Sequence, residues 1–193
     1  MIKRKPGRPK AQQNSISPEN IIAKAIAILD EKGIEQLSMR LIAKEMAITP
    51  MALYHYFADK NALIKAIGNT LYHDIHVSDI TGIQPKIENL LLRYREKVIY
   101  YPQITLAIFS APSLFPEHAT RITEELIHLL NKLGLTKNQA TQWAHILVDY
   151  THGEALASSN LHHNERNIDK PSSENYINAL KMLLNNAVSS LQP

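Results

Sequence analysis

The segment from Leu37 to Lys60 constrains this chain more than any other, because it predicts two short helices separated by only three residues. Ser38 is a favourable N-cap for the first helix. Thr49 caps the second, and Pro50 occupies its first position, where the missing N–H is not needed. A third helix is predicted to begin at Asp59. Two helices joined by so short a turn must pack as an angular pair, so the segment predicts a helix-turn-helix, whose second helix enters a DNA major groove.

The rest of the chain predicts an all-α protein, because apolar residues recur at helical spacing and no segment alternates as a β-strand does. Ser17-Pro18 opens the first helix, and Gly33 follows its end. A helix from Asp59 to about His76 is long enough to leave the head and enter a second unit. We expect a flexible basic arm over residues 1–16, a three-helix DNA-binding domain over 17–62 and a helical regulatory and dimerisation domain over 63–193. In the last domain, a polar loop is predicted from Leu161 to Pro171 and a final helix from Ser172.

The positive charge is concentrated at the N-terminus. Residues 1–10 carry five basic side chains and no acid, whereas the whole chain has a formal net charge of only +3. A flexible basic arm beside a helix-turn-helix suits phosphate contact or entry into a minor groove. The run Gly7-Arg8-Pro9 also resembles the core of an AT-hook, a short arm that lies in A·T-rich minor grooves. The alternative is a tail that only increases solubility.

Composition excludes several classes of protein. The chain has no cysteine, which rules out disulfides and thiolate metal sites and favours a reducing cytoplasm. No apolar run approaches 18 residues, so neither a membrane span nor a signal peptide is expected. We therefore expect a cytoplasmic protein without a membrane partner and without a cofactor.

The block SMRLIAKEMAITPMALYHYFADKNALI resembles the N-terminal domain of the TetR-type transcriptional regulators. The matching residues are Gly33, the Leu37–Arg40 opening, Thr49, the Leu53–Phe57 block and Asp59-Lys60, and the resemblance extends over about residues 18–70. It implies an all-α homodimer that represses transcription from a palindromic operator and is not an enzyme. It also implies a small-molecule effector that binds the C-terminal body and releases the DNA.

The resemblance and the residue chemistry together give a set of expected DNA contacts. Arg40 suits guanine O6 and N7, and Lys60 matches a phosphate-contacting lysine of the family. Leu53 and Phe57 are expected to face the core, which leaves the other side chains of the second helix toward DNA. The expected contacts are Arg8 of the arm and Ser38, Arg40, Thr49, Met51, Ala52, Tyr54, His55, Tyr56 and Lys60 of the head. Among these, Tyr54 and Tyr56 resemble the family's phosphate-binding positions.

Apolar and aromatic residues of the body are candidates for an effector site. They are His76, Tyr94, Ile104, Ile108, Phe109, Trp143, Leu147 and Tyr150, with Asp149 and His152 as further polar groups. Such a mixture suits a mostly apolar ligand. Within the family the start of the body resembles the tetracycline-repressor branch, where His76 matches a ligand-contacting histidine. The bend Ile108–Pro112 lacks that branch's metal-ligating histidine, so a metal–tetracycline chelate is not expected. The alternative is that these side chains only fill the core.

The last two long helices predict a dimer interface, because small residues narrow both of them. The candidate contacts are Gly153, Ala157, Leu180, Leu184 and Ala187. Small residues beside an apolar stripe favour a four-helix arrangement made by two chains. Packing of the same residues within one chain is the alternative.

The nine histidines raise the alternative of a metal site. His73 and His76 share one helix face, and His145, Asp149 and His152 share another. Surface or core histidines are more common than metal ligands, so no metal is expected. Two other functional classes remain as alternatives: a ligand-independent architectural DNA-binding protein and a helical metal-dependent hydrolase.

Overall fold

A computed structural model describes residues 16–162 and 173–189, so Arg8 and the rest of the arm's first 15 residues lie outside the described part. Over the described residues the chain is helical and contains no strand, which confirms the all-α prediction. The helices are α1 (Pro18–Lys32), α2 (Met39–Glu45), α3 (Pro50–Tyr54), α4 (Lys60–Tyr72), α5 (Ile83–Tyr100), α6 (Pro102–Ser110), α7 (Glu117–Lys132), α8 (Lys137–His162) and α9 (Glu174–Ser189), with a 3-10 turn at Pro112–Leu114.

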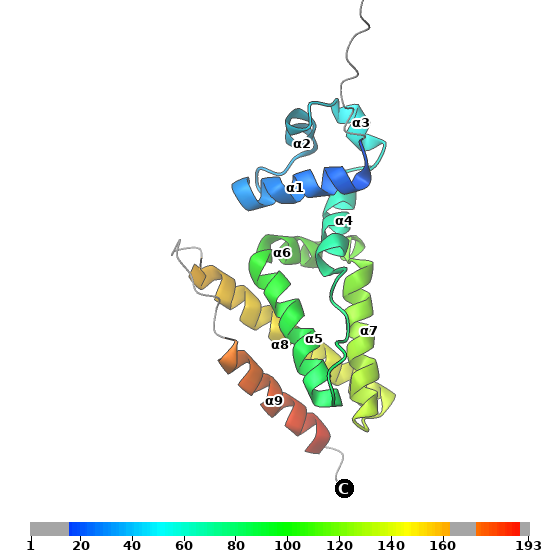
Figure 1. Ribbon diagram of the computed structural model, residues 1–193, viewed down its shortest axis with the longest axis vertical. Coiled ribbons are helices and arrows are strands. Elements are labelled where there is room, and N and C mark those ends of the chain that lie inside the picture. The colour runs from blue at the N-terminus through cyan, green and yellow to red at the C-terminus, as the bar shows by residue number, and fades with distance from the viewer. Residues whose placement is uncertain (1–15, 163–172, 190–193) are drawn as a thin grey trace, which may run out of the picture.

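The helices form a small head and a larger body, and α4 leads from one into the other (Figure 1). The head contains α1, α2 and α3. In the body, α8 packs against both α5 and α7, and α9 packs against α5 and α8. The short helix α6 lies at the end of the body that faces the head. The described residues contain no helix that is both long and apolar enough to cross a bilayer.

Side-chain caps fix where the four helices of the N-terminal region begin, and all four were predicted. Each cap oxygen accepts a hydrogen bond from the backbone N–H three residues later, a contact that stabilises a helix by about 1 kcal/mol. The pairs are Ser17 with Asn20 (3.2 Å), Ser38 with Leu41 (3.2 Å), Thr49 with Ala52 (3.3 Å) and Asp59 with Ala62 (2.7 Å).

The turn of the helix-turn-helix consists of Met46, Ala47 and Ile48, as the sequence predicts. Ala47 has a φ of 54°, a left-handed conformation that costs an alanine roughly 1–2 kcal/mol. The turn is held because the Ile48 amide donates to the Ala43 carbonyl at 3.0 Å. Ile42 of α2 and Leu53 of α3 are fully buried, so the two helices share one core.

Two predicted boundaries are wrong. The helix predicted to reach His76 ends at Tyr72, because two arginines of the body take the carbonyl groups that follow. Arg121 donates to the Tyr72 and His73 carbonyls, and Arg93 donates to those of Asp74 and His76. Helix α8 runs on to His162, so Leu161 belongs to that helix rather than to the predicted loop. Residues 163–172 of that loop lie outside the described part of the chain.

Candidate nucleic-acid interface and effector site

Helix α3 turns most of its side chains toward solvent. Leu53 is fully buried and Phe57, just beyond the helix, is 8% exposed, whereas Met51 is 67% exposed and Tyr54 47% exposed. Thr49 and His55 are also exposed, and Ala52 is half-buried. The inward pair therefore holds α3 in the head and leaves its outer face available to a partner.

Helix α2 contributes Arg40 and Ser38 beside that face. Arg40 lies in the first turn of α2, and its side chain is exposed. Ser38 is also exposed, and its Oγ accepts a hydrogen bond from the Leu41 amide, so its predicted role as a cap is present. Nearby, Lys32 lies 3.1 Å from Glu45 and lowers the pKa of that carboxylate.

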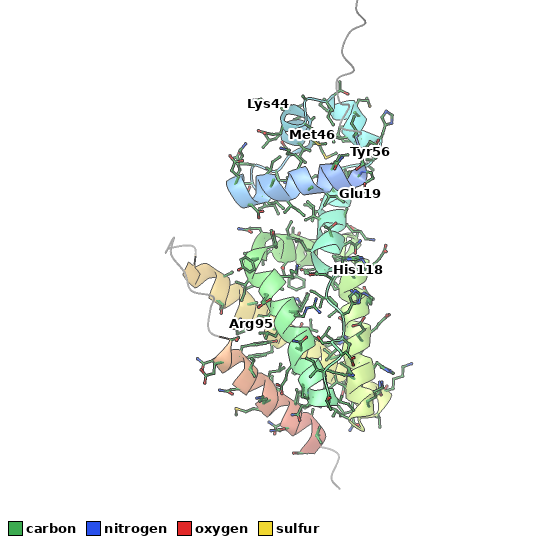
Figure 2. All side chains as sticks on the ribbon, viewed as in Figure 1. Glu19, Lys44, Met46, Tyr56, Arg95 and His118 are labelled. Atoms are coloured by element: carbon green, nitrogen blue, oxygen red, sulfur yellow. The ribbon has the colours of Figure 1, made fainter. Side chains whose placement is uncertain are left out.

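Tyr56 has a partner that the sequence did not predict. Its hydroxyl donates to the carbonyl of Ile16 at 2.9 Å, across 40 residues of sequence. Ile16 is the first residue that the structure describes, and Figure 2 shows Tyr56 at the end of the head where α1 and α3 meet. The expected phosphate donor is thus hydrogen-bonded to Ile16, the residue at which the described part of the chain begins.

Lys60 lies at the boundary between head and body. Its ammonium group donates to the Ile34 carbonyl at 3.4 Å, and the side chain is half-buried. It lines a cleft of about 520 Å³ whose other lining residues come from the α1–α2 loop, α4, α6 and the 3-10 turn. To contact a phosphate, the Lys60 side chain must turn out of this cleft.

The body contains a buried polar cluster to which four helices contribute one residue each: Tyr72, Tyr94, Thr105 and His152. The Tyr94 hydroxyl lies 2.6 Å from His152 Nε2, and the Tyr72 hydroxyl lies 3.4 Å from Thr105 Oγ1. The rings of Tyr72 and Tyr94 are 5.3 Å apart. His152 Nδ1 is buried and has no hydrogen-bond partner among the described residues. Burial lowers the pKa of His152 to about 4 and raises the pKa of Tyr94.

The structure brings together only some of the predicted effector residues. Tyr94 and Phe109 meet at His152, since the Phe109 ring lies 4.7 Å from the imidazole with its plane nearly perpendicular. Ile104, Ile108 and Leu147 are buried in the core, and Trp143 is half-buried. Sequence reasoning missed Tyr72 and Thr105. Tyr72 shares the buried face of α4 with Ile64 and Leu71, a signal that was present in the apolar spacing.

His76 and Tyr150 lie elsewhere. The His76 side chain is 56% exposed, and its Nδ1 accepts a hydrogen bond from Arg121 at 2.6 Å. The Tyr150 ring stacks on Tyr176 of α9, with ring centroids 5.7 Å apart. A cavity of about 270 Å³ between the start of α5 and the end of α7 is lined by Val77, Gly82, Ile83, Lys86, Glu125, His128, Leu129 and Lys132, none of which was predicted.

The predicted dimer contacts divide into two groups. Leu180, Leu184 and Ala187 are fully buried within the chain itself, because the apolar stripe of α9 packs on α5 and α8. This is the intramolecular packing given above as the alternative. Gly153 and Ala157 of α8 are exposed. Ile146, on the same helix, is 45% exposed, and Met182 of α9 is 67% exposed.

The histidine clusters do not form a metal site in the described part of the chain. The rings of His73 and His118 are 5.3 Å apart, and Figure 2 places His118 where α4 meets α7. Arg121 lies among these histidines and lowers the pKa of His118, an effect second to burial. Over the described residues, no three His, Asp or Glu side chains are arranged to hold a metal ion.

Comparisons with known proteins agree with this arrangement. Residues 21–67 match the family model described as bacterial regulatory proteins, tetR family. The regulator BetI of Proteus mirabilis is 34% identical over 58 residues, which are 30% of this chain and 29% of BetI. The chain thus spans less than a third of the length of the curated relatives that it matches first.

Two solved structures share the fold. BioQ with its double-stranded DNA operator has a TM-score of 0.74 and 20% identity, over 91% of this chain and 99% of BioQ. ActR of Streptomyces coelicolor with actinorhodin has a TM-score of 0.73 and 17% identity, over 93% and 100% of the two chains. Residues 87–190, more than half of the chain, match the tetracyclin repressor-like C-terminal domain, and the chain therefore belongs to the tetR family of bacterial regulatory proteins.

Proposed function

We propose that this protein is a transcriptional repressor that binds a palindromic operator as a homodimer and releases it when a small molecule binds the body. The observation that carries the proposal is the outer face of α3, where Met51, Tyr54 and His55 stand exposed on a helix that Leu53 anchors. A short helix held in this way suits insertion into a major groove.

We assign the contacts that position the protein on DNA to polar groups around the outer face of α3. Arg40 contacts a base edge, whereas Tyr54 and Lys60 contact phosphates, and Arg8 of the arm enters the neighbouring minor groove. The solved complex of BioQ with its operator supports the use of this fold on double-stranded DNA. Few of the exposed groups on α3 can form paired hydrogen bonds with a base, so DNA shape supplies part of the specificity.

A second copy of the chain supplies the other half-site reader. The exposed small residues Gly153 and Ala157 permit a close approach of two α8 helices, and Met182 provides exposed apolar surface on α9. A two-fold dimer presents two recognition helices to two half-sites about one helical turn apart.

Effector binding is linked to DNA through α4. This helix begins in the head with Lys60 and ends at Tyr72, within the buried polar cluster. A ligand that binds better to one position of α4 shifts the population toward it and changes the spacing of the two heads. ActR, solved with actinorhodin, supports an effector of small-molecule size.

Operator footprinting tests the proposal directly, first with DNA upstream of the protein's own gene. Lys60→Ala is expected to weaken binding to every sequence and to reduce the salt dependence, whereas Arg40→Ala relaxes preference at particular bases. Lys65→Ala is the matched control, because Lys65 is a half-exposed α4 lysine that lies 3.8 Å from Glu117 of α7 in the body. If the protein showed no sequence preference, the repressor assignment would be wrong and the alternative of a ligand-independent architectural DNA-binding protein would be favoured.

A further inference from the structure

His152 presents an unusual buried group to the centre of the body. The residue is 7% exposed, and its Nδ1 has no hydrogen-bond partner within the described part of the chain. A buried polar atom left without a partner is costly, and native structures contain few of them. The other imidazole nitrogen is fully engaged, since Nε2 lies 2.6 Å from the Tyr94 hydroxyl.

The chemistry of this pair sets the direction of the hydrogen bonds. A phenol is the stronger acid and a bare imidazole nitrogen the stronger base, so the Tyr94 hydroxyl donates to His152 Nε2. In a neutral imidazole the proton then resides on Nδ1, which becomes a donor without an acceptor. The lowered pKa of His152, caused by burial, agrees with a neutral ring at pH 7.

Two aromatic rings pack against the imidazole of His152: Tyr94, with ring centroids 5.3 Å apart, and Phe109, with centroids 4.7 Å apart. Phe109 is 48% exposed, so it connects the buried imidazole with the surface of the body. The charged group that acts on His152 is Asp149, one turn earlier on α8 and itself exposed. The buried cation Arg95 is already paired with Glu154. Among the described residues, His152 Nδ1 is therefore the buried side-chain polar atom left without a partner, and it is a neutral donor.

We propose that the effector of this protein is an uncharged, mostly apolar molecule that displaces Phe109 and places one acceptor oxygen, such as a carbonyl, on His152 Nδ1–H. The inference rests on the proposed function, because it assigns the ligand class of the same regulatory body. It excludes carboxylates, whose desolvation in this apolar site has no buried cation to offset it.

Three probes of similar shape test the assignment: acetophenone, ethylbenzene and benzoate, added to the full-length protein at pH 7 and followed by NMR of the histidine side-chain nitrogens. The free protein should show His152 with its proton on Nδ1. Acetophenone should shift that signal and bind about tenfold more tightly than ethylbenzene, the effect of satisfying one buried donor, and benzoate should bind more weakly. His145, an exposed histidine on the same helix, is the internal control.

Variants separate this contact from packing. His152→Leu should remove the preference for acetophenone over ethylbenzene, and His152→Asn, which keeps a side-chain N–H near the same place, should restore part of it. A proton on Nε2, a signal that acetophenone leaves unchanged, or tighter binding of benzoate would each overturn the inference. None of these measurements uses DNA. Failure of footprinting would therefore overturn the proposed function alone.

Discussion

Gly68 of α4 lies directly against Pro116, the residue before α7: a Cβ built on Gly68 would come 2.7 Å from Pro116 Cγ. The same Cβ would lie 3.3 Å from Ile108 Cδ1 on α6. Helix α4 therefore meets two helices of the body at a point where only glycine fits. Since α4 begins in the head, this contact sets how the head sits on the body.

Gly68→Ala is expected to destabilise the protein by about 1–3 kcal/mol, because the added methyl group must push α4 away from Pro116. It should also change operator affinity, since the displacement is carried along α4 to the head. Urea denaturation and a DNA-binding titration measure the two effects. Pro116→Ala should relieve the clash, so that the double variant is more stable than the sum of the single effects predicts. Strict additivity would show that this contact does not position α4.

Tyr56→Phe distinguishes two roles for one hydroxyl. If the hydroxyl fixes the base of the arm through the Ile16 carbonyl, its loss should weaken operator binding and lower the salt dependence in the full chain. In a protein that lacks residues 1–12, the same substitution should then have little effect. If Tyr56 instead donates to a phosphate, the substitution should reduce operator affinity equally in the full-length and the truncated protein. A double-mutant cycle by fluorescence anisotropy measures the difference.

Local chemistry explains which features were predictable. Ser38, Thr49 and Asp59 cap helices through atoms three residues away, so short sequence windows contain all the information needed. The end of α4 depends on Arg121, which is 49 residues distant from Tyr72, and no local pattern indicates it. Tyr94 and His152 were both predicted as effector-site residues, but their hydrogen bond spans 58 residues and no local pattern indicates it.

The apolar stripe of α9 shows a different limit. Periodicity indicates that Leu180 and Leu184 face a neighbour, but it does not say whether that neighbour belongs to the same chain or to a partner. In the structure both residues are fully buried against their own chain. A small side chain likewise does not indicate whether the helix that approaches it belongs to the same chain or to a partner. The structure distinguishes the two cases by exposure: Gly153 and Ala157 are exposed, whereas the alanines of the core are buried.

Glu154→Gln should destabilise the body, because it leaves a buried guanidinium without its partner. The Arg95 side chain is 2% exposed and is paired with Glu154, while its guanidinium lies 5.0 Å from the centre of the Tyr176 ring on α9. Figure 2 shows Arg95 on α5. Breaking a buried pair from one side typically costs about 3 kcal/mol or more. Urea denaturation measures the change.

An ion pair between α5 and α9 whose cation is exposed provides the control. Glu88 of α5 lies 3.9 Å from Lys181 of α9; the Lys181 side chain is 51% exposed, whereas the two carboxylates, Glu88 and Glu154, are similarly buried, with side chains 19% and 23% exposed. Glu88→Gln should change stability by less than about 1 kcal/mol. Equal effects at Glu88 and Glu154 would mean that burial of the Arg95 cation does not govern the strength of its pair. Replacing Arg95 and Glu154 together by Met and Leu should recover much of the loss.

Gly153→Ala tests the dimer face of α8. A Cβ on Gly153 meets no atom within 4 Å among the described residues of its own chain, so the substitution should stabilise the helix itself by about 0.5–1 kcal/mol. In a dimer whose α8 helices approach closely at this point, the same methyl group should weaken association. Sedimentation equilibrium measures the dimer constant and denaturation measures the stability. A dimer that tightens or stays unchanged would place the interface elsewhere.

The burial of His152 also predicts how stability depends on pH. Its folded pKa is lowered from 6.5 to about 4, so the unfolded chain takes up a proton first as the pH falls. Above about pH 6.5 the neutral His152 makes its full contribution to the free energy of unfolding. This contribution declines as the pH falls from 6.5 to 4, and the total loss below that range is up to about 3 kcal/mol. His152→Asn does not titrate there and should show a flatter profile over this window.

The difference between the two profiles isolates His152 from the other groups, because a group such as Glu154, whose carboxyl pKa is lowered by Arg95 against the effect of burial, is present in both proteins and cancels. His118, whose pKa is also lowered, is present in both proteins and cancels in the subtraction. Parallel profiles for the wild type and His152→Asn between pH 4 and 6.5 would show that folding does not lower the pKa of His152. The imidazole would then not be desolvated in the folded protein, and its Nδ1–H would not be the buried donor that the effector proposal requires.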